Sequence, residues 1–331
     1  MDFKKKTIIL VSILAVLVVT YTLGTIFSPA SIRERRREQR LFPQASVEDA
    51  SEIVINKSDS TITLKKDNEK WFLSIGGSLY PAIQGGTEDL VKTAVKQNQF
   101  RIVTKSKDKW DQFEVTEEKA ERLTIKDSKG NNLVDILIGK QGLEESGNYL
   151  RLPKNNEVYF VDTPFTSYIN RDIDYWSYLK FFDEKPDVNT VEQLSCKADI
   201  AITKDTSVDS DYTLIAQAEQ NKPIQWKVKG QDLSIKNEKV TALLNTITSL
   251  TGNTFAVGAT KDETGLDNPK AIISFTQNNG DTVSISVGKE TGEERFFVHN
   301  SSNGIIYKVS AWKLKNIIKP LNSLIAENKP E

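Results

Sequence analysis

The second half of this 331-residue chain repeats the pattern of the first half, and this repeat limits the folds that the chain can adopt. The stretch 122–140, RLTIKDSKGNNLVDILIGK, corresponds to the stretch 271–289, AIISFTQNNGDTVSISVGK. Each consists of an apolar run, a turn that contains glycine, a second apolar run and a final Gly-Lys. The repeat therefore predicts two modules of one fold, arranged in tandem.

Further correspondences extend the repeat in both directions. Apolar residues alternate from Glu52 onward, which is typical of strands, and stripes of apolar residues at helical spacing follow. The matched segments are 71–73 with 226–228, 90–98 with 240–250, 149–151 with 296–298, and 158–161 with 306–309. The sequence predicts an α+β protein with modules at 46–183 and 184–328, each an antiparallel, meander-like sheet with helices on one face.

Glycines and a threonine predict local structure within the modules. Gly85 and Gly86 should interrupt the regular secondary structure, and Thr87 should serve as the N-cap of the helix that follows. Gly139 and Gly288 should lie in turns at the ends of strands, where glycine tolerates a positive φ angle.

Residues 7–27, TIILVSILAVLVVTYTLGTIF, carry no charge. About twenty apolar residues in a helix match the thickness of the hydrocarbon core of a bilayer. We expect an uncleaved, single-pass transmembrane signal anchor, preceded by a basic cytoplasmic start at 1–6. A cleaved signal peptide is the alternative. A lipoprotein anchor is excluded because the only cysteine, Cys196, lies far downstream.

A basic juxtamembrane segment at 28–45 follows the apolar run. Its arginines are candidates for contact with anionic headgroups: Arg33, Arg35, Arg36, Arg37 and Arg40. The alternative is a solvated helix that extends the anchor, with ion pairs such as Glu34 with Arg37. The positive-inside rule would place the side that carries these arginines in the cytoplasm.

The charge of the body argues against nucleic acid as a partner. After the first 40 residues the chain has 36 basic and 42 acidic side chains. Nucleic-acid binding needs a concentrated basic face, which a body of this sign does not favour.

The residues that could perform chemistry are sparse. His299 is the only histidine, so a triad or a zinc site would depend on it. The acidic pairs Asp172/Asp174 and Asp209/Asp211 are expected to fall in hydrophilic linkers, and Cys196 is expected to be a buried, inert thiol. We expect no catalytic residue, no cofactor and no metal, and a protein that is not an enzyme.

Several short motifs of the second copy resemble a bacterial family. They are Trp226, Gly265-Leu266-Asp267-Asn268-Pro269, Val287-Gly288-Lys289 and Ile306-Tyr307-Lys308-Val309. This pattern resembles the family called domain of unknown function 4340. The first copy is degenerate, with Gln112–Val115 in place of Gly-Leu-Asp-x-Pro. The resemblance implies a structural repeat motif at Trp71, Gly139, Tyr159, Trp226, Gly265, Leu266, Asp267, Pro269, Gly288 and Tyr307.

The resemblance also implies a setting. Such proteins typically have one span, hold their repeats outside the cytoplasm and accompany ABC transporters of the gliding-motility type. We therefore expect a non-catalytic accessory or scaffold subunit at the bacterial inner membrane, with the bulk of the chain in the periplasm. Its partners would be the lipid bilayer, through 7–27, and a permease or auxiliary subunit of an ABC transporter. The alternatives are a module that binds an envelope glycan through exposed aromatics on its hairpins and, less favoured, a hydrolase of unknown substrate.

Overall fold

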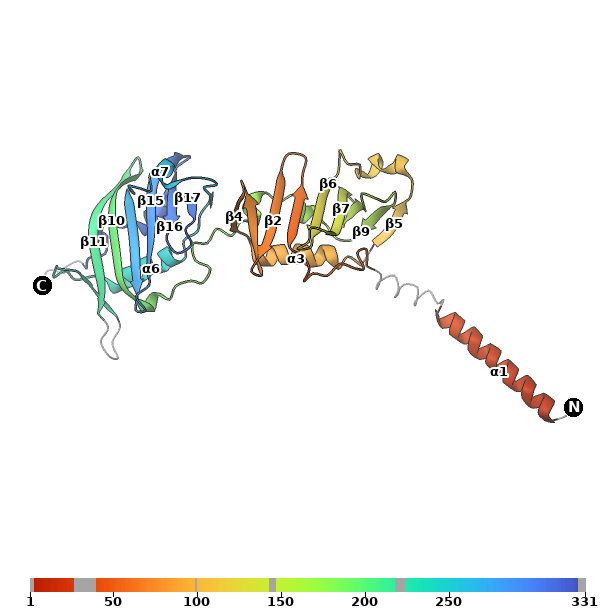
Figure 1. Ribbon diagram of the computed structural model, residues 1–331. Helices are drawn as coiled ribbons and strands as arrows, with labels where there is room; N and C mark the ends of the chain where they lie inside the picture. Colours follow the sequence, from red (N-terminus) through yellow and green to blue (C-terminus); the bar gives the residue numbers. More distant parts are fainter. Residues whose placement is uncertain (1–2, 27–39, 99, 143–146, 218–223, 327–331) are drawn as a thin grey trace. The chain divides into compact units, whose positions relative to one another are not determined.

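The computed structural model describes residues 3–26, 40–98, 100–142, 147–217 and 224–326 (Figure 1). Helix α1 spans Phe3–Ile26, and its side chains are described from Val11 to Gly24. Within the described ranges, no helix has both the length and the apolar character needed to cross a membrane. The predicted span 7–27 extends beyond the residues whose side chains are described.

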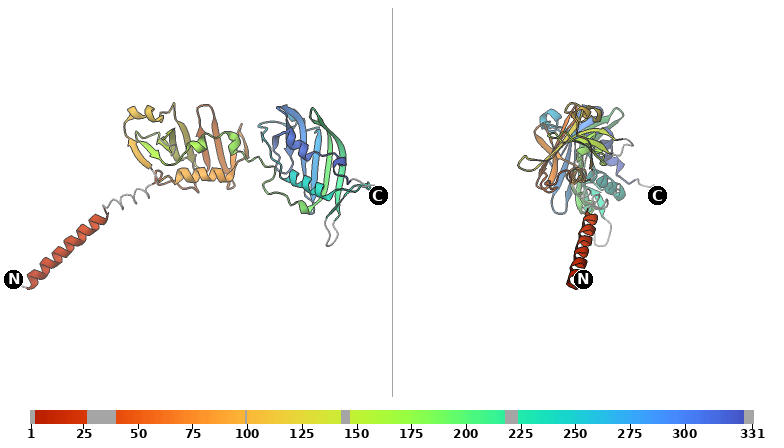
Figure 2. Two further views of the ribbon diagram at one scale, coloured as in Figure 1. Left: turned by 180° about the vertical axis from the view of Figure 1, so that it is seen from behind. Right: turned by 90° about the vertical axis from the view of Figure 1, so that its right-hand side faces the viewer.

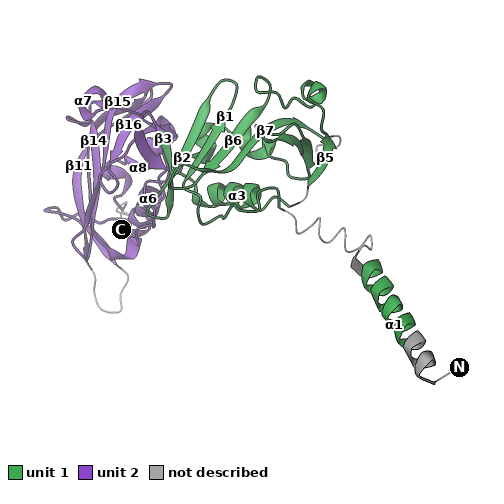
Figure 3. Ribbon diagram, turned by 45° about the vertical axis from the view of Figure 1, so that its right-hand side comes forward, with its two compact units in different colours: residues 1–74, 82–176 green, residues 75–81, 177–331 purple. Residues whose placement is uncertain are grey.

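The rest of the chain is mixed helix and sheet, and sheet predominates. It divides into two compact units (Figure 3). Unit 1 comprises Met1–Ser74 and Ala82–Trp176, and unit 2 comprises Ile75–Pro81 and Ser177–Glu331.

The first sheet is antiparallel, in the order β4-β3-β2-β1-β6-β7-β8-β9-β5. Alternate residues of β1, β2 and β3 are buried, as expected for strands with one face on a core. The bounds of these strands are β1 Glu52–Asn56, β2 Thr61–Asp67, β3 Lys70–Ile75, β4 Ser78–Pro81, β5 Phe100–Thr104, β6 Glu121–Lys126, β7 Asn132–Gln141, β8 Asn148–Arg151 and β9 Val158–Val161.

The second sheet is also antiparallel, in the order β12-β11-β10-β14-β15-β16-β17-β13. Its bounds are β10 Val191–Thr203, β11 Thr206–Gln217, β12 Gln225–Val228, β13 Thr254–Phe255, β14 Ala271–Gln277, β15 Thr282–Gly292, β16 Arg295–Asn300 and β17 Ile306–Ser310.

The two sheets share one connectivity. If β1 is equated with β10, β2 with β11 and β3 with β12, the later strands match in turn, and β5 takes the place of β13 at the end of its sheet. The predicted antiparallel sheets are therefore confirmed. The strands alone do not decide the predicted arrangement of helices on a single face.

Apart from α1, the longer helices of the two units bury their apolar stripes. Helix α3, Gln84–Val95, packs against β7 and runs across the strand direction in both Figure 1 and the left view of Figure 2. Helix α6, Asn237–Thr248, contacts β12 and α8, Ala311–Ile317. The shorter helices are α4 Thr166–Ile169, α5 Ile173–Trp176 and α7 Lys261–Thr264, with 3-10 turns η1 Lys107–Lys109, η2 Asp111–Phe113, η4 Val188–Thr190 and η5 Leu321–Ser323.

One helix start differs from the prediction. Gly85 and Gly86 lie inside α3, and Thr87 is not its N-cap but donates from its hydroxyl to the carbonyl of Ile83 at 2.6 Å. The helix begins at Gln84, whose side chain is bonded to a neighbouring strand. This tertiary contact outweighs the weak helix propensity of the two glycines.

Candidate functional site

The repeated tryptophans mark a contact between a strand and the start of a helix. Trp71 of β3 and Trp226 of β12 are both buried. The amide N–H of Trp71 donates to Gln84 Oε1 at 2.8 Å, and that of Trp226 donates to Asn237 Oδ1 at 2.8 Å. Gln84 and Asn237 are the first residues of α3 and α6. The same hydrogen bond thus joins helix to sheet in each copy. The sequence did not indicate its acceptors, Gln84 and Asn237.

The repeated glycines let a backbone loop lie close against a strand. The prediction that they lie in turns was therefore wrong. Gly139 lies inside β7 and Gly288 inside β15, and neither has a positive φ. A Cβ on Gly139 would collide with the carbonyl oxygen of Phe113, and a Cβ on Gly288 with that of Thr264. Only glycine lets a backbone loop come this near.

The approaching loop has the same conformation in both copies. Gly265 ends α7 with φ 70°, and Glu114 ends η2 with φ 57°, both in the left-handed region. The next residues, Leu266 and Val115, are buried against Gly288 and Gly139 respectively. The Gly-Leu part of the motif therefore has a structural equivalent in the degenerate first copy. A glutamate there adopts a backbone conformation that is more natural for glycine.

The repeated tyrosines anchor a hairpin. Tyr159 accepts a hydrogen bond from Asn155 Nδ2 at 3.3 Å, and Tyr307 accepts one from Asn303 Nδ2 at 3.0 Å. In both cases the asparagine lies four residues earlier, in the turn. Burial is the main cause that raises the pKa of each phenol, Tyr159 to about 12 and Tyr307 to about 12. Both stay neutral and act as structural hydrogen-bonding groups.

The end of the motif lies at the surface. Asp267 is exposed and Pro269 is half-buried. Pro269 lines a shallow groove of about 700 Å³ together with Asp199, Asp209 and Lys270. Among the described residues, no group of three or more His, Cys, Asp or Glu side chains is placed to hold a metal ion.

The side chains considered for catalysis lie mainly in strands. Asp209 and Asp211 are in β11, so the prediction of a linker there was wrong. His299 lies in β16 between Ser286 and Ile306, and burial together with the charge of Lys261 lowers its pKa. Cys196 is buried in β10, and burial raises its pKa to about 11, so the thiolate is disfavoured.

Sequence reasoning missed a buried arginine. Arg151 is 1% exposed; its Nε donates to the carbonyl of Val115 at 2.8 Å and its Nη2 to Glu117 at 3.1 Å. Its guanidinium lies 3.8 Å from the centroid of the Trp110 ring. These partners offset the cost of burying the charge and fix the loop that approaches Gly139. No spacing in the sequence indicates them, because they are more than thirty residues away.

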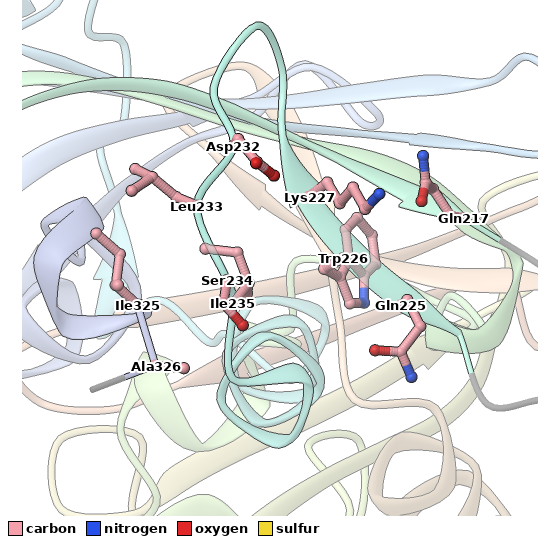
Figure 4. Close-up of a pocket in the computed structure, with 10 residues that line it drawn as sticks. All are labelled: Gln217, Gln225, Trp226, Lys227, Asp232, Leu233, Ser234, Ile235, Ile325 and Ala326. Atoms are coloured by element: carbon pink, nitrogen blue, oxygen red, sulfur yellow. The ribbon is translucent and has the colours of Figure 1, made fainter. Parts of the chain in front are cut away.

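A cavity of about 480 Å³ lies beside β12 in unit 2 (Figure 4). Lys227 and Asp232 contribute charges, and Ile325 contributes an apolar wall. The stretch 232–235 on one side is held by the C-terminal segment, since the N–H of Ala326 donates to the carbonyl of Ser234 at 2.8 Å.

A third groove, of about 640 Å³, lies among polar loops of unit 1 around Lys66 and Asp127.

The predicted headgroup contacts are largely outside the described part of the chain. Arg33, Arg35, Arg36 and Arg37 fall in the range 27–39, which is not described. Arg40 is described and its side chain is exposed.

Comparison with known proteins gives one match. A family model described as Domain of unknown function (DUF4340) matches residues 76–269, more than half of the chain. The matched region ends at Pro269 and includes the Gly-Leu-Asp-x-Pro motif, so the resemblance seen in the sequence is confirmed. No curated protein and no solved structure matches the chain.

Proposed function

Because the chain belongs to the Domain of unknown function (DUF4340) family, we propose that it is a membrane-anchored, non-catalytic scaffold that serves an ABC-type transport system. The observation that carries this proposal is the nature of the repeated contacts. Trp71 and Trp226, Gly139 and Gly288, and Tyr159 and Tyr307 each hold the fold of their own copy together. Duplication has preserved a way of building two sheets, which supports a role in presenting surfaces to a partner.

The N-terminal helix supports the anchoring part of the proposal. Residues 7–27 carry no charge, and the described apolar side chains of α1 are exposed, with Leu14 at 62%. Exposed apolar surface of this extent favours an apolar surrounding. We place the bulk of the chain outside the cytoplasm at the inner membrane, with Arg33, Arg35, Arg36, Arg37 and Arg40 beside the headgroups.

The sheets are the surfaces offered for docking in this proposal. We infer that the helices of each module cover one face of its sheet and leave the other face to a permease or auxiliary subunit. A broad antiparallel sheet with one solvated face can accept such a partner without rearrangement.

The test is co-purification from native membranes. The tagged full-length chain is extracted in mild detergent, and the proteins recovered with it are quantified against an unrelated single-span protein that carries the same tag. We expect enrichment of an ABC ATPase and its permease. Recovery of no transport component would contradict the proposal.

One feature of unit 1 favours the second candidate, a glycan-binding module. Three rings form a strip on β8, β9 and η2: Tyr149 lies 4.6 Å from Phe113 and 5.3 Å from Phe160, between centroids. Tyr149 and Phe113 are half-buried, and Phe160 is buried. Arg101 lies over Phe160 at 4.9 Å and Lys140 over Phe113 at 6.0 Å. Aromatic faces beside polar groups are typical of sites that bind sugars by stacking and hydrogen bonding.

Retention of the full-length chain on immobilised envelope glycan tests this candidate. Tyr149→Ala should reduce retention, because it removes the central ring of the strip. Trp312→Ala is the matched control, since Trp312 is an exposed aromatic on another element, α8. Equal retention of both variants and the native chain would rule out the strip as the binding surface.

A further inference from the structure

The edge strand of unit 2 is covered by a segment from much earlier in the chain. Phe255 of β13 is 4% exposed, and its ring lies 4.8 Å from that of Tyr80. The hydroxyl of Tyr80 accepts a hydrogen bond from the N–H of Gly258 at 3.3 Å. Tyr80 lies in β4, which hydrogen-bonds to β3 at the edge of the first sheet, within the stretch Ile75–Pro81 that belongs to unit 2. This stretch therefore closes the end of the second sheet.

The corresponding edge strand of unit 1, β5, presents a more exposed residue. Phe255 pairs with Tyr307 across β13 and β17, and Ile102 pairs with Tyr159 across β5 and β9. Ile102 is thus the counterpart of Phe255, but it is 47% exposed. An exposed apolar residue on an edge strand is a site where another chain can add.

The segment that could cover Ile102 also has a counterpart in the second copy. Ile75–Pro81 begins at the last residue of the repeated tryptophan strand β3 and contains β4, and residues 229–235 follow β12. Both stretches contain a glycine with positive φ, 57° at Gly76 and 75° at Gly230, and both lead to an amide residue that begins a helix. Tyr80 lies four residues before the first amide residue, Gln84, and Leu233 lies four residues before the second, Asn237. Leu233 is therefore the counterpart of Tyr80.

Most of the stretch 229–235 is accessible, although Ile235 at its end is buried. Asp232 and Ser234 are exposed, Leu233 is half-buried, and all three line the cavity in Figure 4. Bonds from the C-terminal segment hold the stretch in place, since Lys236 donates its N–H to the carbonyl of Leu324 at 2.9 Å. A segment that is already held in place loses little conformational freedom on docking.

We propose that a second copy of this chain docks head to tail, with its residues 229–235 lying on β5 as Ile75–Pro81 lies on β13. Leu233 of one copy covers Ile102 of the other. Asp232 then approaches Arg101, and the opposite charges favour this register. The two surfaces differ, so the contact is heterologous and leaves an open end on each copy for further additions.

Site-directed cross-linking tests the contact. Ile102→Cys and Leu233→Cys are made separately in the full-length chain, with the buried native thiol removed by Cys196→Ala. The two variants are mixed and treated with a short bis-maleimide. Proximity should give about ten times more dimer than in a mixture of Ser128→Cys with Leu233→Cys, because Ser128 is exposed on another turn of unit 1.

Each variant alone is a further control. A heterologous contact predicts little dimer from Ile102→Cys alone, whereas a symmetric contact through β5 would give abundant dimer. Equal yields from the Ile102 and Ser128 mixtures, or strong linking of Ile102→Cys to itself, would overturn the proposal.

Sedimentation of the otherwise native chain gives an independent readout. We expect its apparent mass to rise with concentration and Ile102→Lys to abolish the rise, because the substitution places a charge under Leu233. Ile102 is exposed, so the variant should fold as the native chain does. A native chain that stays monomeric, or assembly that survives Ile102→Lys, would contradict the docking.

Discussion

At the scale of single residues, the motif glycines show how the same residue type serves different needs. Gly265 supplies a backbone conformation, with φ 70°. Gly139 and Gly288 supply empty space, because a loop carbonyl occupies the position of a side chain. Sequence alone indicates that glycine is required at such a position. The reason for the requirement depends on a loop more than twenty residues away.

The close approach predicts that Gly139→Ala and Gly288→Ala each lower the free energy of unfolding by about 1–3 kcal/mol, as overpacking does. Urea denaturation of the full-length chain measures this. Gly85→Ala is the matched control: it lies in α3 with an ordinary φ and nothing near its Cβ position, so it should be neutral or stabilising. If all three variants have the same free energy of unfolding, the close approach of the loop does not require glycine at positions 139 and 288.

The lowered pKa of His299 predicts a pH dependence of stability. Burial and Lys261 disfavour the imidazolium, so the folded pKa lies below the ordinary value of 6.5. As the pH falls through 6.5 the unfolded chain takes up the proton first, and the free energy of unfolding decreases. Above this range the histidine is neutral in both states and has no effect.

Urea denaturation at pH 7.5 and pH 5.5, compared between the native chain and His299→Gln, isolates this contribution. We expect the native chain to lose more stability at the lower pH than the variant does. A loss of equal size in both would show that other groups are responsible.

At the scale of elements, strands were easier to predict than their registers. The alternation of apolar residues located β1, β2 and β3 and the hairpins that follow the helices. One correspondence was wrong by one residue: Val298, which pairs with Tyr307, matches Leu150, which pairs with Tyr159. Sequence alignment placed Val298 against Arg151 instead. The aromatic pattern is similar in both registers, and only the pairing across the hairpin decides between them.

The starts of α3 and α6 give the prediction at this scale. Gln84→Ala and Asn237→Ala should each lower the free energy of unfolding by about 1–2 kcal/mol, because each leaves the backbone N–H of a buried tryptophan, Trp71 or Trp226, without its hydrogen-bond acceptor. Gln231→Ala is the control, since Gln231 is exposed in a loop. Thermal or urea denaturation measures all three. If Gln231→Ala lowered the free energy of unfolding as much as the other two variants do, the hydrogen bonds from Gln84 and Asn237 would have no special importance for stability.

At the scale of the whole molecule, the repeat and the family could be predicted from the sequence, but several features of the surface could not. Short motifs that include Trp226 and Gly265–Pro269, both inside the matched range 76–269, were enough to indicate the family. The burial of Arg151 under Trp110 and the covering of Phe255 by Tyr80 were not foreseen, because each joins distant segments by side-chain packing. The counterparts of Arg151 and Phe255 are His299 and Ile102, so the two copies differ at both of these positions.

The central claim is that the chain is held at a membrane with its two modules outside the cytoplasm, and cysteine labelling in intact spheroplasts tests it most directly. Ser60→Cys places a thiol on an exposed turn of unit 1, and Asp2→Cys places one before the apolar run; Cys196 is buried and serves as an internal negative. We expect a membrane-impermeant maleimide to label Ser60→Cys in intact spheroplasts and Asp2→Cys only after permeabilisation. Labelling of Asp2→Cys alone in intact spheroplasts, or recovery of the chain free of the membrane fraction, would contradict the account.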